Sequence, residues 1–208
     1  MKGTFLVMEG LDGSGKTSTI KLLSSFFKNI GRKHIVVTQP SQTLIGGLIR
    51  SRLRKEWECN GGCLQALYLA DGINTINKEI LPNLKKGIDV ICDRYSLSAY
   101  AYGSVGADYN WLKNSFDVFI NPDITFFLDV PVTECVKRLQ KEKESLELYE
   151  NENILNRVYN NYLRAINDFK EQHNIVKING NQSIEKVSED IKNILKNIED
   201  TSFDSDCP

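Results

Sequence analysis

The feature that most constrains this chain is the stretch GLDGSGKT at residues 10–17, which fits the pattern G-x-x-x-x-G-K-[ST] at every fixed position. An apolar run at 5–8 precedes it, and apolar residues with helical spacing follow over 16–30. The glycines let backbone N–H groups turn inward around phosphate oxygens, and the helix N-terminus adds partial positive charge. The sequence therefore predicts a strand, a phosphate-binding loop and a helix, in that order.

Short apolar runs alternate with helical patterns along the rest of the chain. This alternation is typical of a parallel sheet covered by helices on both faces. The expected strands are 5–8, 34–38, 88–92, 124–128 and 175–178, and the expected helices are 16–30, 44–53, 64–84, 96–102, 109–119, 132–143, 155–172 and 183–198. We expect one α/β domain of the P-loop NTPase fold over 1–198, with a five-stranded parallel sheet, and a flexible acidic tail over 199–208.

Composition narrows the functional classes. Twenty-six Lys and Arg against 27 Asp and Glu give a net charge of −1, which argues against a polybasic nucleic-acid binder. No uncharged apolar run reaches the roughly 18 residues of a membrane span, and MKGTFLVMEG lacks the apolar core of a signal peptide. Five cysteines, an odd number, suit a reducing compartment. We therefore expect a cytoplasmic protein without nucleic-acid or membrane partners.

A second motif follows the apolar run at 88–92. Asp93 stands where an α/β sheet places ligands, and it is expected either to bind Mg²⁺ or to orient an acceptor; a helix N-cap is the alternative. Arg94 offers forked donors for a second phosphate. In the loop, Lys16 is expected to reach the β- and γ-phosphates of ATP and Thr17 to hold Mg²⁺. The whole loop is the expected ATP site: Gly10, Leu11, Asp12, Gly13, Ser14, Gly15, Lys16 and Thr17.

A phosphate loop alone suits a GTPase, an ATPase motor or a small-molecule kinase, but the N-K-x-D guanine motif is not matched by NKEI at 77–80. Over residues 3–196 the chain resembles the thymidylate kinase family, most of all its archaeal-type members. The resemblance implies transfer of the ATP γ-phosphate to a deoxynucleoside monophosphate, dTMP above all, with Mg²⁺, and it implies a homodimer. The matching motifs are FLVMEGLDGSGKT, QPS-x-T-x-x-G-x-x-IR, LYLAD, DRYSLSAYAY, NPDITFFLDVP and LYENENILNRVYNNYL.

Residue roles follow from the same resemblance. It implies catalytic roles for Lys16, Arg94, Asp12 and Arg138, with Asp12 near the sugar 3′-hydroxyl, Arg94 on the acceptor phosphate and Asp93 near the metal. Arg138 is the first residue of a lid expected over 138–150. The acceptor is expected to contact Asp12, Arg50, Tyr68, Arg94, Ser98, Tyr102 and Tyr149, with Tyr68 stacked on the base and Tyr102 against the sugar. Without the resemblance, Tyr68 and Tyr102 would be interpreted as helix-face packing.

The chain departs from the family pattern at three places. Gly72 and Gly103 replace an arginine and a glutamine that contact the base. Either Arg50, Asn74 or Gln65 takes over thymine recognition, or the two glycines open space for another base. Thr38-Gln39 replaces Arg-Glu, and the lid offers Arg138, Lys141 or Lys143 as its cation. The rival functions are a deoxynucleoside kinase and a non-enzymatic nucleotide-binding scaffold.

Overall fold

A computed structural model of the chain describes residues 2–142, 148–149 and 151–204. Its strands form one parallel sheet in the order β2-β3-β1-β4-β5, which confirms the expected α/β fold. The strands are β1 (Phe5–Gly10), β2 (His34–Thr38), β3 (Asp89–Asp93), β4 (Ile124–Asp129) and β5 (Ile175–Asn179). Since β1 lies at the centre of the sheet, the loop that follows it emerges in the middle of the carboxyl edge, where such sheets bind ligands.

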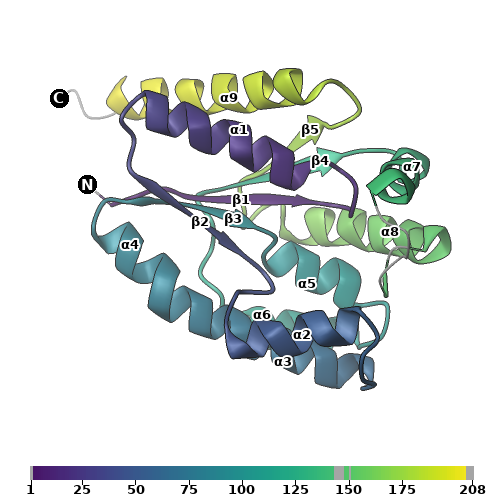
Figure 1. Cartoon of the computed structure of the whole chain (residues 1–208). Coiled ribbons are helices and arrows are strands. Elements are labelled where there is room, and N and C mark those ends of the chain that lie inside the picture. The colour runs from purple at the N-terminus through teal and green to yellow at the C-terminus, as the bar shows by residue number, and fades with distance from the viewer. Residues whose placement is uncertain (1, 143–147, 150, 205–208) are drawn as a thin grey trace.

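Helices cover both faces of the sheet (Figure 1). On one face, α1 (Lys16–Asn29) and α9 (Ile184–Asp204) lie side by side. The remaining helices are α2 (Leu44–Leu53), α3 (Gly61–Thr75), α4 (Leu81–Lys85), α5 (Ser96–Gly103), α6 (Tyr109–Phe116), α7 (Val132–Glu142) and α8 (Glu152–Phe169). None of the helices in the described ranges is long and apolar enough to cross a membrane.

The central strand explains why the sequence shows an unbroken apolar run. Phe5 and Val7 join the core beneath α5 and α8, whereas Leu6 and Met8 join the core beneath α1 and α9. Both faces are buried, so alternate side chains all meet apolar surroundings. Glu9 continues the same alternation and therefore points to the α5 side.

Two expected helices differ clearly from the structure, while the ends of the others differ by up to three residues. The pattern over 64–84 predicts one helix, but α3 is followed by a π-helical turn, η1 (Ile76–Ile80), and then by α4. Pro82 lacks an N–H and its ring crowds the carbonyl one turn earlier, which accounts for the wider turn before it. The sequence also predicts a helix end at Ile198, whereas α9 continues to Asp204 because no glycine or proline interrupts 184–204. Residues 205–208 lie outside the described residues.

Candidate functional site

The loop between β1 and α1 has the backbone of a phosphate cradle. Gly13 and Gly15 adopt φ values of 78° and 92°, and Gly15 is the N-cap of α1. A Cβ at Gly13 would lie 2.5 Å from the carbonyl oxygen of Cys135. Only glycine fits there, so the loop can pass close to α7 and turn its N–H groups toward an anion.

Lys16 lies inside this cradle. Its Nζ donates to the carbonyl oxygens of Gly10 (3.1 Å) and Leu11 (2.8 Å), and its side chain is buried. Burial, with a further contribution from the nearby Arg94 charge, lowers the pKa of Lys16 to about 8. Both acceptors are neutral, so the ammonium group holds a charge that bound phosphate oxygens would stabilise.

The next residue, Thr17, lies beside Asp93. Thr17 Oγ1 donates to Asp93 Oδ2 at 3.0 Å, which joins the start of α1 to the end of β3. A hydroxyl and a single carboxylate are oxygen ligands of the kind that Mg²⁺ takes together with phosphates. Asp93 is not the helix cap that was the alternative, since the N-cap of α5 is Tyr95. Among the described residues no group of three or more His, Cys, Asp or Glu side chains that could hold a metal ion occurs.

Arg94 contacts Asp12, Ser98 and Tyr102, all expected site residues. Its Nη2 donates to Asp12 Oδ1 (2.5 Å), its Nη1 donates to Ser98 Oγ (3.3 Å), and the guanidinium lies 4.8 Å from the ring centroid of Tyr102. The Tyr102 hydroxyl donates to Asp12 Oδ2 at 2.9 Å. Arg94 adopts φ 70°, an uncommon conformation for a non-glycine residue that other contacts must hold in place.

Glu9 stabilises the start of α5, next to Arg94. This role was not predicted from the sequence. It is fully buried, and its carboxylate accepts hydrogen bonds from the N–H groups of Tyr95 (2.8 Å) and Ser98 (3.0 Å). The hydroxyls of Ser98 (2.5 Å) and Tyr162 (2.9 Å) donate to it as well. Glu9, a residue of β1, therefore caps the N-terminus of α5. Its signal in the sequence is an acid that ends an otherwise apolar run.

Two neighbouring pockets meet at Arg94. The loop pocket contains the cradle, including Gly13, Gly15, Lys16, Thr17, Arg50, Asp93 and Arg138. The aromatic pocket is lined by Asp12, Gln39, Pro40, Leu53, Gln65, Tyr68, Arg94, Tyr95, Ser98, Ala99, Tyr102 and Tyr149. Asp12, Gln39, Pro40, Leu53 and Arg94 line both pockets. A group bound in one pocket can therefore meet a group bound in the other beside Arg94 and Asp12.

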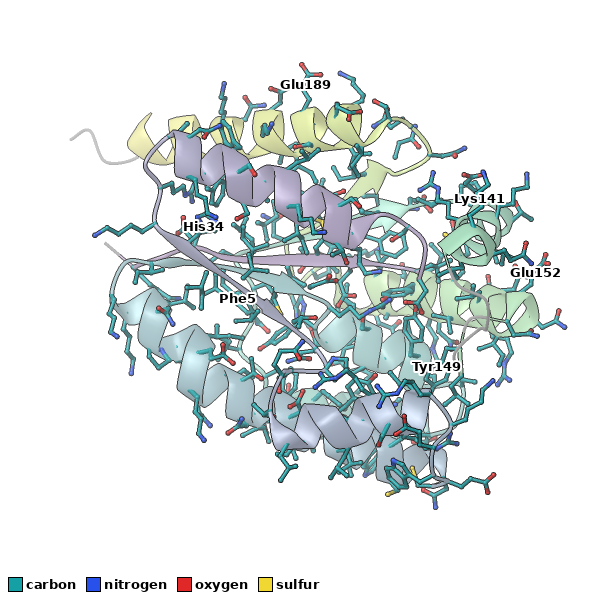
Figure 2. The ribbon with its side chains drawn as sticks, viewed as in Figure 1. Phe5, His34, Lys141, Tyr149, Glu152 and Glu189 are labelled. Carbon is teal, nitrogen blue, oxygen red and sulfur yellow. The ribbon has the colours of Figure 1, made fainter. Side chains whose placement is uncertain are left out.

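Tyr68, expected to stack on the base, and Tyr149, expected at the edge of the lid, both line the aromatic pocket. Tyr149, on the segment between α7 and α8 (Figure 2), has its ring centroid 5.5 Å from that of Tyr102. Leu148 N donates to the carbonyl of Leu53 at 3.1 Å, which ties this segment to α2. Burial raises the pKa of Tyr149 to about 12, so its phenol stays neutral.

Arg50 lines the loop pocket and not the aromatic pocket. Its Nη1 donates to the carbonyls of Pro40 (3.3 Å) and Ser41. Asp71 of the LYLAD motif holds the same turn, since it accepts from Ser41 N (2.7 Å) and Ser41 Oγ (2.5 Å). These contacts fix the turn and place the Arg50 guanidinium beside the cradle.

Among the three candidate lid cations, Arg138 is the one placed at the cradle. Its Nη1 donates to the Gly13 carbonyl at 3.4 Å and its Nε donates to Glu134 Oε1 at 3.0 Å. Lys141 is exposed on α7 (Figure 2) and lines neither pocket. Lys143, with the rest of 143–147 and residue 150 of the expected lid, lies outside the described residues.

The two unusual glycines do not open the aromatic pocket. A Cβ at Gly72 would lie 2.0 Å from Phe119 Cζ, and one at Gly103 would lie 3.0 Å from both Cδ and Oε1 of Gln65. The idea that these glycines make space for another base is therefore wrong, because Phe119 and Gln65 occupy that space. Of the three proposed replacements, Gln65 alone is confined to the aromatic pocket, while Asn74 lines neither pocket.

A phosphate cradle on a helix N-terminus, a hydroxyl–carboxylate pair and an arginine shared with a second pocket define a P-loop nucleotide kinase. The family model described as thymidylate kinase matches residues 8–191. The probable thymidylate kinase of Pyrococcus abyssi is 35% identical over 202 residues, covering 94% of this chain and 97% of that protein. That of Methanocaldococcus jannaschii is 36% identical over 196 residues, covering 93% and 96%.

A solved structure of thymidylate kinase from Candida albicans gives a TM-score of 0.81 at 25% identity, covering 95% of this chain and 93% of that one. The chain belongs to the thymidylate kinase family. The resemblance of its motifs to this family is thereby confirmed.

Proposed function

We propose that the chain transfers the γ-phosphoryl group of ATP to the phosphate of dTMP, giving ADP and dTDP. The observation that carries the proposal is the position of Arg94, which lines both pockets while contacting Asp12 and Ser98. A planar guanidinium suits a phosphate at that border. Membership of the thymidylate kinase family supports dTMP as the acceptor.

The loop pocket suits ATP with Mg²⁺. Residues 10–17 would surround the β- and γ-phosphates with N–H groups, and Lys16 and Arg138 would add positive charge. Thr17 and Asp93 would hold Mg²⁺, which when bound neutralises charge on the phosphates. The transition state of phosphoryl transfer needs positioning and positive charge more than covalent chemistry, and these side chains provide both.

The aromatic pocket suits the acceptor. Arg94 would bind its phosphate, with Arg50 approaching from the turn at Ser41. Asp12 and Tyr102 would face the sugar, and Tyr68 would stack on the base. Tyr149 would close the pocket against water, as the edge of a lid over 138–150.

Two rival functions fit the site less well. A deoxynucleoside kinase needs a general base for a sugar hydroxyl, whereas Asp12 in the aromatic pocket is held in an ion pair with Arg94. A nucleotide-binding scaffold has no use for an arginine at the border of two pockets or for a charged Lys16 held by neutral carbonyls.

The proposal is tested by ADP release with ATP, Mg²⁺ and a panel of acceptors: dTMP, dUMP, dCMP, dAMP, dGMP, their ribose counterparts and thymidine. We expect dTMP to be preferred and thymidine to be inert. Lys16→Ala and Arg94→Ala should each lower kcat by at least about 100-fold, since each removes charge from the transferred group. Arg164→Ala is the matched control, because Arg164 packs on Tyr109 and lines neither pocket. Turnover of thymidine, or none by the folded protein, would reject the proposal.

We also propose a homodimer. Leu44 and Leu48 of α2 and Ile73 of α3 are exposed by 84%, 46% and 38%. These two helices pack against each other, and their exposed apolar residues, here called the α2–α3 face, are the candidate interface.

We further propose that residues 1–198 act as one kinase domain in a reducing, cytoplasmic setting. Support for that setting comes from the four free thiols in the described part of the chain: Cys59, Cys63, Cys92 and Cys135.

A further inference from the structure

Gln65 has an unusual position for a polar side chain. It lies on α3, is only 1% exposed and lines the aromatic pocket. Within the described residues its Oε1 has no hydrogen-bond partner. A buried polar atom left in this state costs roughly 1–3 kcal/mol, so one that borders a ligand pocket points to a partner supplied by the ligand.

Two other polar atoms of the pocket wall also lack a partner in the described residues, Gln39 Nε2 and the Tyr95 hydroxyl. Gln39 lines both pockets, which places it at the phosphate border. The Tyr95 ring packs against Phe5 and Phe119, with centroids 5.1 and 5.0 Å away, and its hydroxyl lies near the backbone of Ile120. Gln65 is therefore the amide that belongs to the aromatic pocket alone.

The neighbours of Gln65 indicate which part of a ligand it meets. Tyr68 follows three residues later on the same helix, and residues at this spacing share a face. Asp12 and Arg94 line both pockets, so they mark the border of the aromatic pocket with the cradle, whereas Gln65 and Tyr68 line the aromatic pocket alone. An aromatic ring and an amide side by side can receive the flat face and the polar edge of one base.

We propose that Gln65 recognises the base of the acceptor, with Oε1 accepting the N3–H of thymine and Nε2 donating to O4. This inference rests on the proposed function. A primary amide presents an acceptor and two donors in one plane, which matches the N3–H and O4 of a pyrimidine imide. The pairing satisfies the buried oxygen and fixes the base beside Tyr68.

Gly103 makes room for this role. A Cβ at position 103 would lie 3.0 Å from both Cδ and Oε1 of Gln65, which is closer than most real Cβ contacts. Because Gly103 of α5 has no side chain, the amide of Gln65 on α3 can lie at this point of the pocket wall. Gly103 is a positioning residue for Gln65.

The experiment compares dTMP with N3-methyl-dTMP, which lacks the proton that Oε1 is proposed to accept. For the wild type we expect kcat/KM to be about 10- to 100-fold lower for the methylated substrate. In Gln65→Leu, which keeps the volume but cannot hydrogen-bond, kcat/KM for dTMP should fall and the ratio between the substrates should shrink to within about 3-fold. Asn74→Leu is the matched control, on the same helix but outside both pockets, and should keep the wild-type ratio.

The outcomes separate this inference from the proposed function. If Gln65→Leu weakens both substrates equally and keeps the ratio, Gln65 acts only in packing and the inference is wrong. If the wild type turns over no monophosphate, the proposed function fails, and calorimetric binding of dTMP and N3-methyl-dTMP then makes the same comparison. Gln65→Met, which also lacks an amide, replaces Gln65→Leu if thermal unfolding shows the leucine variant to be misfolded.

Discussion

Lys16 links the electrostatics of the site to pH. Because burial lowers its pKa to about 8, the free protein loses this charge as the pH rises through 8. Bound phosphates favour the charged form, so ATP binding above pH 8 must take up a proton. We predict that the Kd for ATP rises about 10-fold between pH 7 and pH 9, measured by calorimetry in buffers of different ionisation enthalpy.

Lys16→Arg provides the control, because arginine stays charged throughout this range. Its ATP affinity should be nearly independent of pH between 7 and 9, whatever its absolute value. An identical pH dependence in Lys16→Arg would assign the effect to another group and would refute the proposed titration of Lys16.

Single residues differ in how well the sequence predicts them. The cradle and the Asp93-Arg94 pair stand in contiguous motifs with a fixed geometry, so their placement could be expected. Glu9 contacts residues far away in the sequence, such as Ser98. Gln65 occupies space that the missing side chain of Gly103 leaves free. Only the folded chain shows that Gly72 and Gly103 face Phe119 and Gln65 and do not face the pocket.

At the scale of elements, α5 depends on a cap from outside its own segment. Its N-cap Tyr95 makes no side-chain cap, while Glu9 of β1 accepts hydrogen bonds from Tyr95 N and Ser98 N. We predict that Glu9→Gln, which removes the negative charge and replaces an acceptor with a donor, lowers the free energy of unfolding by about 1–3 kcal/mol. Urea denaturation measures this change, and hydrogen exchange should show reduced protection in α5.

The matched control is Glu171→Gln, which makes the same chemical change at an exposed position and should leave the urea midpoint unchanged. Equal midpoints for Glu9→Gln and the wild type would mean that Glu9 does not stabilise α5.

The elements themselves follow local patterns closely, and their ends follow them less well. Strands buried on both faces give short apolar runs, so all five expected strands appear in the sheet. The turn at η1 arises from the effect of Pro82 on the preceding backbone, a local rule that periodicity alone does not contain.

At the scale of the whole molecule, the parallel topology brings the site residues together. Asp12 and Lys16 follow β1, Asp93 and Arg94 follow β3, and both strands end at the same edge of the sheet. The aromatic pocket is completed by Tyr68 of α3 and by Tyr149 of the segment after α7. A sequence pattern predicts that the site lies at the carboxyl edge of the sheet. The depth and borders of the two pockets depend on how α2, α3 and α5 pack.

The α2–α3 face gives a prediction about assembly. In a two-fold dimer each substitution occurs twice at the interface, so a buried carboxylate would weaken association strongly. We predict that the wild type sediments with twice the monomer mass and that Leu44→Glu combined with Leu48→Glu yields a folded monomer. Val118→Glu serves as the control, because Val118 is 61% exposed but lies outside the α2–α3 face. A monomeric wild type, or dissociation by Val118→Glu alone, would show that this face is not the interface.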